Sequence, residues 1–141
     1  METNQKQKLT IGVTVSAPVE KVWKMFNEPE HVKKWNNASP DWHTPHAEND
    51  VRKGGSFNYR MEARDGSFGF DFGGTYSEVD HEKSLAYTLG DGREVSATFT
   101  ANGDSTRIDE TFEAEGQNPV EMQQAGWQSI LDNFKKYAES N

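Results

Sequence analysis

Cysteine is absent from the sequence, which excludes disulfide bonds, thiolate nucleophiles and cysteine-ligated zinc. No apolar run approaches the roughly 18 residues that a membrane-spanning helix needs. Residues 1–8 are polar and lack the apolar stretch of a secretory signal. The formal net charge of −8 opposes binding to nucleic acid or to anionic lipid. We therefore expect a cytoplasmic protein that neither binds nucleic acid nor inserts into a membrane.

Aliphatic side chains are also scarce. Leu, Ile, Val and Phe together fall below the fifth of the chain under which a charged sequence is often disordered. Against this, the chain has eight Phe, four Tyr and four Trp, and its apolar residues recur periodically. Disordered sequences lack both features. The 141 residues are enough for one domain. We expect a disordered tail at residues 1–8 and a single domain over residues 9–139, with a core built mainly from rings.

Apolar periodicity predicts a strand and two short helices before residue 36. Strict alternation over Leu9–Val15 is typical of a half-buried strand. Apolar residues then recur at helical spacing over Pro18–Asn27, and a second short helix is predicted over Pro29–Trp35. The polar, proline-containing residues 36–50 are predicted to form a loop.

The middle of the chain predicts an antiparallel meander. Between Val51 and Ala114, apolar and polar residues alternate in short segments, and Asp65-Gly66, Asp91-Gly92 and Asn102-Gly103 are turn sequences. The segment from Pro119 to about Glu139 then carries an apolar stripe at helical spacing and predicts the longest helix. That stripe has one obvious place to be buried, the concave face of the sheet.

Five segments carry a resemblance to a known family. They are Ala17–Trp23, Pro29–Trp35, the Asp-x-Arg-x-Gly-Gly pattern in Asp50–Phe57, Gly74–Val79 and Gly126–Leu131, in this order along the chain. Together they resemble the START/polyketide-cyclase-like (SRPBCC) superfamily. Within it, the chain is similar to the bacterial branch related to the C-terminal domain of the heat-shock protein 90 ATPase activator.

The resemblance implies an α+β helix-grip fold. In this fold a curved antiparallel sheet of about seven strands wraps around a long C-terminal helix, in the order β-α-α-β6-α. It also implies a cavity between sheet and helix. The candidate cavity residues are mainly aromatic: Trp35, Trp42, His43, Phe57, Tyr59, Met61, Phe68, Phe70, Phe72, Tyr76, Tyr87, Phe99, Glu110, Phe112, Trp127, Ile130 and Phe134. A solid aromatic core is the alternative.

Glu110 is the candidate whose position gives the most specific functional signal. It lies between Ile108 and Phe112 on the phase assigned inward, where a carboxylate is costly unless it is paired or protonated. It would anchor a ligand hydroxyl or amine, or act as a general acid. The alternatives are a register slip, a position near the open end of the sheet, or an ion pair with Arg93 or Arg107.

The predicted loop carries residue types that can bind a divalent metal. They are Asp41, His43, His46, Glu48 and Asp50, but a proline separates the two histidines and no helix face aligns them. We predict no metal and no cofactor, and expect Trp42 and His43 to cover the rim of the cavity instead.

Three functions follow from these observations. The first is binding of a small hydrophobic or amphipathic molecule, such as a lipid or a polyketide-like or flavonoid-like compound, oriented by Glu110 or Tyr59. The second is a cyclase or dehydratase in which Glu110, His43 or Tyr59 moves protons. The third is a stress-response role with a chaperone partner, as the resemblance implies. We assign no catalytic residue and expect a monomer or a weak dimer.

Overall fold

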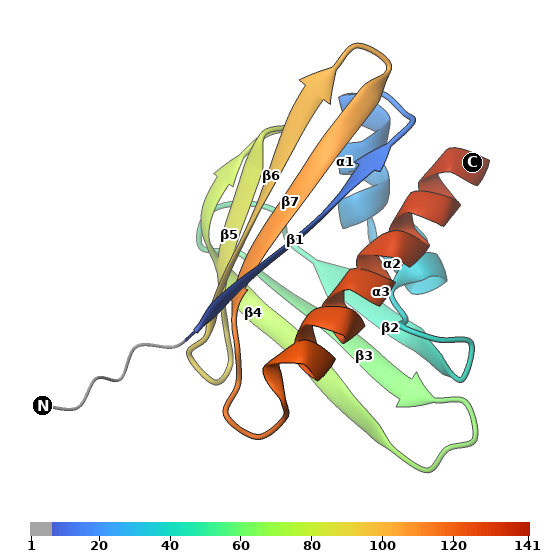
Figure 1. The fold of residues 1–141 in the computed structure, drawn as a ribbon, viewed down its shortest axis with the longest axis vertical. Coiled ribbons are helices and arrows are strands. Elements are labelled where there is room, and N and C mark those ends of the chain that lie inside the picture. Colours follow the sequence, from blue (N-terminus) through green and yellow to red (C-terminus); the bar gives the residue numbers. More distant parts are fainter. Residues whose placement is uncertain (1–6) are drawn as a thin grey trace, which may run out of the picture.

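The computed structural model describes residues 7–141, which form seven strands and three helices (Figure 1). Residues 1–6 of the predicted tail lie outside the described residues, and the first strand begins at Lys8. The elements are β1 Lys8–Val15, α1 Val19–Asn27, α2 Pro29–Trp35, β2 Trp42–Asn49, β3 Ser56–Ala63, β4 Gly69–Asp80, β5 Ser84–Leu89, β6 Glu94–Asn102, β7 Ser105–Glu113 and α3 Val120–Ser140.

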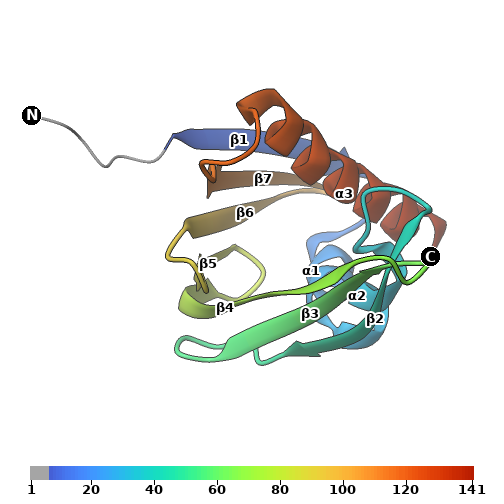
Figure 2. The ribbon, with the colours of Figure 1, turned by 90° about the horizontal axis from the view of Figure 1, so that it is seen from below.

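All seven strands form one antiparallel sheet in the order β1-β7-β6-β5-β4-β3-β2. Every neighbouring pair is consecutive in sequence except β1 and β7, where Lys8 pairs with Glu113 and Val15 with Thr106. The sheet curls around α3, and α1 and α2 lie at one end of its concave side (Figures 1 and 2). The predicted helix-grip fold is confirmed.

Close backbone approaches accompany the curvature at β4. A Cβ atom at Gly73 would lie 2.6 Å from the carbonyl oxygen of Phe57, and one at Gly74 would lie 2.5 Å from that of Thr88. Only glycine fits at such distances, so these residues allow β3, β4 and β5 to bend together. The register of β4 against β5 then shifts between Tyr76 and Glu78, which adds to the bend.

The prediction of a loop over residues 36–50 was wrong in its second half, because residues 42–49 form β2. This strand lies at the edge of the sheet and pairs only with β3. The register shifts between His43 and His46, at the position of Pro45. A proline is tolerated there because an edge strand has no second neighbour to which it must donate a hydrogen bond.

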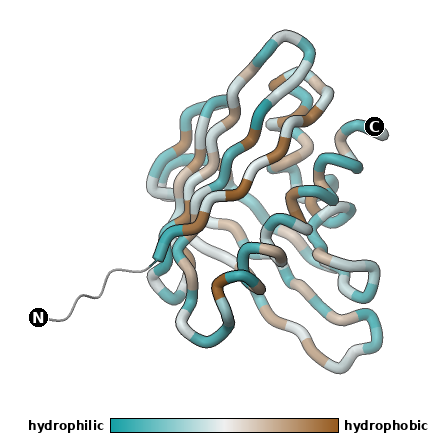
Figure 3. The backbone as a smooth tube through the Cα atoms, viewed as in Figure 1, coloured by the Kyte–Doolittle hydropathy of each residue, from teal (hydrophilic) through white to brown (hydrophobic). Residues whose placement is uncertain are grey.

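Hydrophobic and hydrophilic residues alternate along the strands, which places one face of the sheet against α3 (Figure 3). At the end covered by α1 and α2, rings fill this space. Phe26 lies 5.2 Å from Phe99 and 5.3 Å from Phe134 between ring centroids. Trp35 lies 4.9 Å from Phe134 in an edge-to-face contact, and its Nε1 donates a hydrogen bond to the Met25 carbonyl at 2.9 Å. This ring cluster closes one end of the concave face.

Candidate functional site: an aromatic cavity with a buried carboxylate

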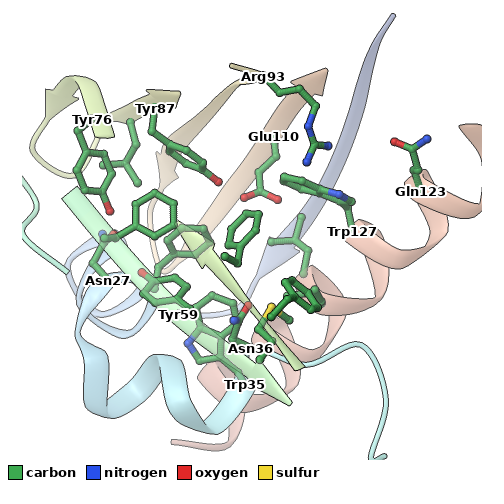
Figure 4. A pocket seen from close by; sticks show the side chains of 18 of the residues that line it. Asn27, Trp35, Asn36, Tyr59, Tyr76, Tyr87, Arg93, Glu110, Gln123 and Trp127 are labelled. Carbon is green, nitrogen blue, oxygen red and sulfur yellow. The ribbon is translucent and has the colours of Figure 1, made fainter. Parts of the chain in front are cut away.

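A cavity of about 260 Å³ lies between the concave face of the sheet and α3 (Figure 4). Its walls come from β3, β4, β5 and β7 on one side and from α3 on the other, with the ends of α1 and α2 below. Most of the lining is aromatic or aliphatic. The lining residues are Phe26, Asn27, Trp35, Asn36, Phe57, Tyr59, Met61, Phe70, Phe72, Tyr76, Leu85, Tyr87, Arg93, Glu110, Glu115, Gln123, Trp127, Ile130 and Leu131.

Eleven of the seventeen candidate residues lie on this wall. They come from four strands and two helices, and the curvature of the sheet brings them together. They are Trp35, Phe57, Tyr59, Met61, Phe70, Phe72, Tyr76, Tyr87, Glu110, Trp127 and Ile130.

Three of the other candidates lie outside the cavity on the β2–β3–β4 side. Phe68 precedes β4 in the hairpin and is 61% exposed, because this hairpin extends past the cavity. It contacts Trp42 at 6.0 Å between centroids, and Trp42 also lies 6.0 Å from Phe70, which is 39% exposed. His43 pairs in register with Glu62, on the face of β3 opposite the cavity.

The remaining three candidates belong to the packed core. Phe99 and Phe134 are in the ring cluster around Phe26. Phe112 is fully buried behind Trp127, with centroids 4.0 Å apart and planes inclined by 5°. This stack fixes the indole of Trp127, whose edge also meets Phe72 at 5.9 Å. Trp127 therefore spans from α3 to β4 across the cavity.

Several polar lining residues were not among the candidates. Asn27 is the last residue of α1, and Asn36 follows α2. Asn27 Nδ2 donates a hydrogen bond to the Trp23 carbonyl at 3.0 Å, and Asn36 Nδ2 donates one to Thr44 Oγ1 at 3.3 Å. Their sequence pattern is that of helix ends, so nothing local marked them as lining residues. Leu85 and Leu131 lie at inward positions of the apolar pattern, but they were not predicted to line the cavity because the candidates were mainly aromatic. Arg93, Glu115 and Gln123 come from segments next to the turns at one end of the sheet.

Gln123 holds the segment between β7 and α3 in place. Its Nε2 donates to the carbonyls of Glu115 at 3.1 Å and Asn118 at 2.8 Å, and its Oε1 accepts from the Glu115 amide at 2.8 Å. The side chain is buried, so these bonds satisfy groups that would otherwise lack partners. They fix the first turn of α3 beside the cavity.

Glu110 occupies the inward phase of β7, as the alternation predicts. It is 7% exposed, and its carboxylate points between Tyr87 and Trp127 (Figure 4). Burial raises its pKa from 4.5 to about 7. Among residues 7–141, no side chain forms a hydrogen bond or an ion pair with this carboxylate. The two arginines considered as alternative partners are engaged elsewhere: Arg93 binds Asp91 at 2.8 Å, and Arg107 binds Asp109 at 3.1 Å.

Three tyrosines supply further polar atoms in the cavity. Tyr76 donates its hydroxyl proton to Asn49 Oδ1 at 2.6 Å. Burial raises the pKa of Tyr59, with a further contribution from Tyr76. Burial, followed by the negative charge of Glu110, raises the pKa of Tyr87. All three phenols therefore stay neutral and can donate or accept hydrogen bonds.

The proton-transfer set considered for an enzyme does not assemble. His43 Nε2 lies 3.9 Å from Glu62 Oε1 outside the cavity, whereas Glu110 and Tyr59 are inside it. The metal-binding residue types do not converge either, since Asp50 binds Arg52 at 2.8 Å. Within residues 7–141, no group of three or more His, Asp or Glu side chains is placed to hold a metal ion. None of the described helices is both long and apolar enough to cross a membrane.

A curved antiparallel sheet closed over a long C-terminal helix, with an aromatic cavity between them, defines an SRPBCC-type helix-grip protein. The chain belongs to the family of Activator of Hsp90 ATPase homolog 1-like proteins, whose family model matches residues 16–139. No match was found among curated proteins.

Solved structures agree with this assignment. An AHSA1-like protein from Aeromonas hydrophila is 43% identical and superposes with a TM-score of 0.89, over 95% of this chain and 93% of that one. A Cytophaga hutchinsonii protein is 54% identical with a TM-score of 0.82, over the same shares of the two chains. A Nitrosomonas europaea protein at 22% identity has a TM-score of 0.80 over 94% of each chain, a likeness of fold alone.

Proposed function

We propose that this protein binds a small hydrophobic or amphipathic molecule in the cavity between the sheet and α3. The observation that carries the proposal is a space walled by rings from three strands and α3 that encloses a carboxylate without a protein partner. Binding sites for small molecules are mostly apolar, with a few placed polar groups that set orientation. Glu110 and the tyrosine hydroxyls are such groups here.

The size of the cavity narrows the ligand class. Its volume of about 260 Å³ lies just below the range of about 300–1,000 Å³ typical of sites for drug-sized ligands. Of the classes that the family resemblance suggests, a compact one- or two-ring compound fits this space better than a lipid with long chains. The flat faces of Phe57, Tyr59 and Trp127 suit a ring system.

Access to the cavity is proposed to pass between α3 and the β3–β4 hairpin. Phe70 is on the wall and is 39% exposed, and Phe72 meets Trp127 across the gap at 5.9 Å. The side chains of Phe70 and Phe72 can therefore turn aside by rotation, while Trp127 stays stacked on Phe112. Trp42, expected to gate the mouth, supports Phe70 from outside.

A ligand screen read by tryptophan fluorescence, with native mass spectrometry of protein purified from cells, tests the proposal. The matched variants are Ile130→Trp, which fills the cavity, and Met122→Trp, which adds the same ring at a position of α3 that is 61% exposed. The expected result is binding by the wild type and by Met122→Trp and none by folded Ile130→Trp. Equal binding by both variants, or no bound species with any compound, would overturn the proposal.

A second candidate function is binding to a chaperone, which the family match suggests and one surface feature favours. Trp42, Phe68 and Phe70 form a partly exposed aromatic cluster beside the hairpin between β3 and β4. Exposed rings of this kind are common at protein interfaces. Capture of the bacterial heat-shock protein 90 by the wild type, lost in Phe68→Ser, would support this function. Capture that is absent, or unchanged in the variant, would reject it.

A further inference from the structure

Resting on the proposed function, we infer that the ligand of the cavity is an organic cation. It would be an amine or quaternary ammonium group attached to a ring or a short apolar chain. The charged group would lie against the carboxylate of Glu110, and the apolar part would fill the space between Phe57, Tyr59 and Trp127.

The first argument is the missing partner of Glu110. A buried carboxylate is stabilised by a cation or by hydrogen-bond donors, and its removal from water is costly without them. Arg93 is the one cationic side chain on the cavity wall, and its guanidinium binds Asp91 at 2.8 Å and the Glu113 carbonyl at 3.5 Å. The position opposite Glu110 is therefore open to a positive group of the ligand.

The second argument is the arrangement of rings around this carboxylate. Tyr87 and Trp127 lie on either side of Glu110, and Tyr59 contributes a further ring to the cavity wall (Figure 4). The faces of aromatic rings attract cations, most strongly for tryptophan, and several rings around one point form the usual cage for an ammonium group. Because Phe112 is stacked on Trp127 at 4.0 Å, the indole is held in place before any ligand arrives.

The third argument is the sign of the surrounding charge. Glu115, on the rim, has a lowered pKa because it accepts hydrogen bonds from Asn118 and Gln117, so it is ionised at neutral pH. With a net charge of −8, the whole molecule attracts cations and repels anions. An anionic ligand would meet Glu110 and Glu115 without a free cation to compensate, which disfavours fatty acids and other carboxylates.

Cation binding couples to the protonation of Glu110. The titratable groups that line the cavity with it are Tyr59, Tyr76 and Tyr87, whose raised pKa keeps them neutral, together with Arg93 and with Glu115, whose pKa is lowered. In the empty protein Glu110 holds its proton below a pKa of about 7. A cation selects the ionised form, so its binding releases that proton and weakens about tenfold from pH 8 to pH 6.

Isothermal titration calorimetry with three probes tests the inference. 2-Phenylethylamine and 2-phenylethanol share one skeleton and differ in charge, and benzyltrimethylammonium carries a charge that pH cannot change. At about pH 8 we expect both cations to bind at least tenfold more tightly than the alcohol. At about pH 6, where Glu110 is mostly protonated before binding, the binding heat of the cations should depend on the ionisation enthalpy of the buffer. In Glu110→Gln, this preference and the proton release should disappear while the alcohol still binds.

Glu94→Gln is the matched control, since it removes an exposed carboxylate of β6 that does not line the cavity and should change the cation affinity by less than about twofold. Circular dichroism melts establish that both variants are folded. Equal affinity for amine and alcohol, or a preference that survives Glu110→Gln, would overturn the inference while leaving the proposed function intact. If none of the probes binds, the inference fails, and the ligand screen with Ile130→Trp decides the proposed function separately.

Discussion

Glu110 is placed in the interior by its neighbours along β7 rather than by its own chemistry. Thr106, Ile108 and Phe112 share its phase and are fully buried, so the alternation of the strand carries the carboxylate inward. Facing a cavity rather than packed carbon, it keeps contact with open space while remaining shielded from bulk water. A residue in this position lowers stability when it is ionised and offers that charge to a ligand.

The titration of Glu110 should appear in the stability of the protein. Its pKa is about 7 in the folded state and 4.5 in the reference state, so the folded form holds an extra proton between these values. The wild type should lose about 3 kcal/mol of its unfolding free energy as pH rises from about 4.5 to about 7 on account of this group. Glu110→Gln should lack this component, as measured by urea unfolding at several pH values.

NMR titration of the Glu110 side-chain carboxyl carbon checks the same prediction directly, with an expected midpoint near pH 7. Glu94, an exposed glutamate on β6, serves as the comparison. A midpoint for Glu110 close to that of Glu94, or a stability difference between wild type and Glu110→Gln that does not vary with pH, would contradict it.

At the scale of the elements, α3 forms the lid of the site and is tied to the rest of the molecule along its length. Near its start, Gln123 binds the segment after β7. In its middle, Trp127 is stacked on Phe112. Near its end, the hydroxyl of Tyr137 is 2.6 Å from Nδ1 of His31 in α2. These ties hold the helix over the curved sheet without filling the space between them.

The bonds of Gln123 predict a local effect on the start of α3. Gln123→Ala removes three hydrogen bonds to the backbone of Glu115 and Asn118, so we expect a loss of about 1–3 kcal/mol in unfolding free energy. Hydrogen exchange at the Glu115 amide should accelerate with it. Gln124→Ala, on the exposed side of the same turn, should change stability by less than about 0.5 kcal/mol. Equal effects of the two substitutions would show that Gln123 does not hold this segment.

The ring contact between β4 and α3 predicts an effect on ligand exchange. Phe72→Ala removes the ring that meets Trp127 across the gap, which should widen the entrance. Because Phe72 is only half-buried, its stability cost should be about 1–3 kcal/mol, below that of a core phenylalanine. Stopped-flow fluorescence should show faster association and dissociation of the ligand. Unchanged rates would place the entrance elsewhere.

At the scale of the whole molecule, the cavity is a consequence of closing one curved sheet over one helix. The strand from the start of the chain pairs with β7, so the two ends of the domain meet next to α3. Rings fill the half of the concave face beneath α1 and α2, whereas α3 covers the other half and leaves a cavity between itself and the sheet. The cavity therefore lies in the half of the concave face that α1 and α2 do not cover.

Occupancy of that space should stabilise the entire fold. A ligand that binds only the folded state adds about 2.7 kcal/mol to the unfolding free energy at a hundredfold excess over its Kd. The melting temperature of the wild type should rise with increasing benzyltrimethylammonium concentration. That of Ile130→Trp, whose cavity is filled, should not change. A concentration-independent melting temperature in both proteins would contradict binding of this cation in the cavity.

The site could be anticipated only in part, and the errors have physical causes. Alternation assigned Glu110, Tyr59 and Tyr87 to the inner face, and they line the cavity. It also assigned Phe68 inward, but alternation cannot show that a hairpin extends past the wall that it helps to build. Pro45 and the polar residues near it hid β2, because an edge strand with a bulge lacks the regular pattern of a buried one.

Local sequence determined the order of the elements and the inward face of most strands, because apolar period and turn residues act over a few positions along the chain. It also determined which side chains could line the inner face of the sheet, namely aromatic rings rather than aliphatic groups and one carboxylate, that of Glu110. Only the tertiary structure decided that Phe99 and Phe134 pack while Phe57 and Trp127 enclose space. That division depends on how far the sheet bends and where α3 crosses it, which are properties of contacts between residues far apart in the chain.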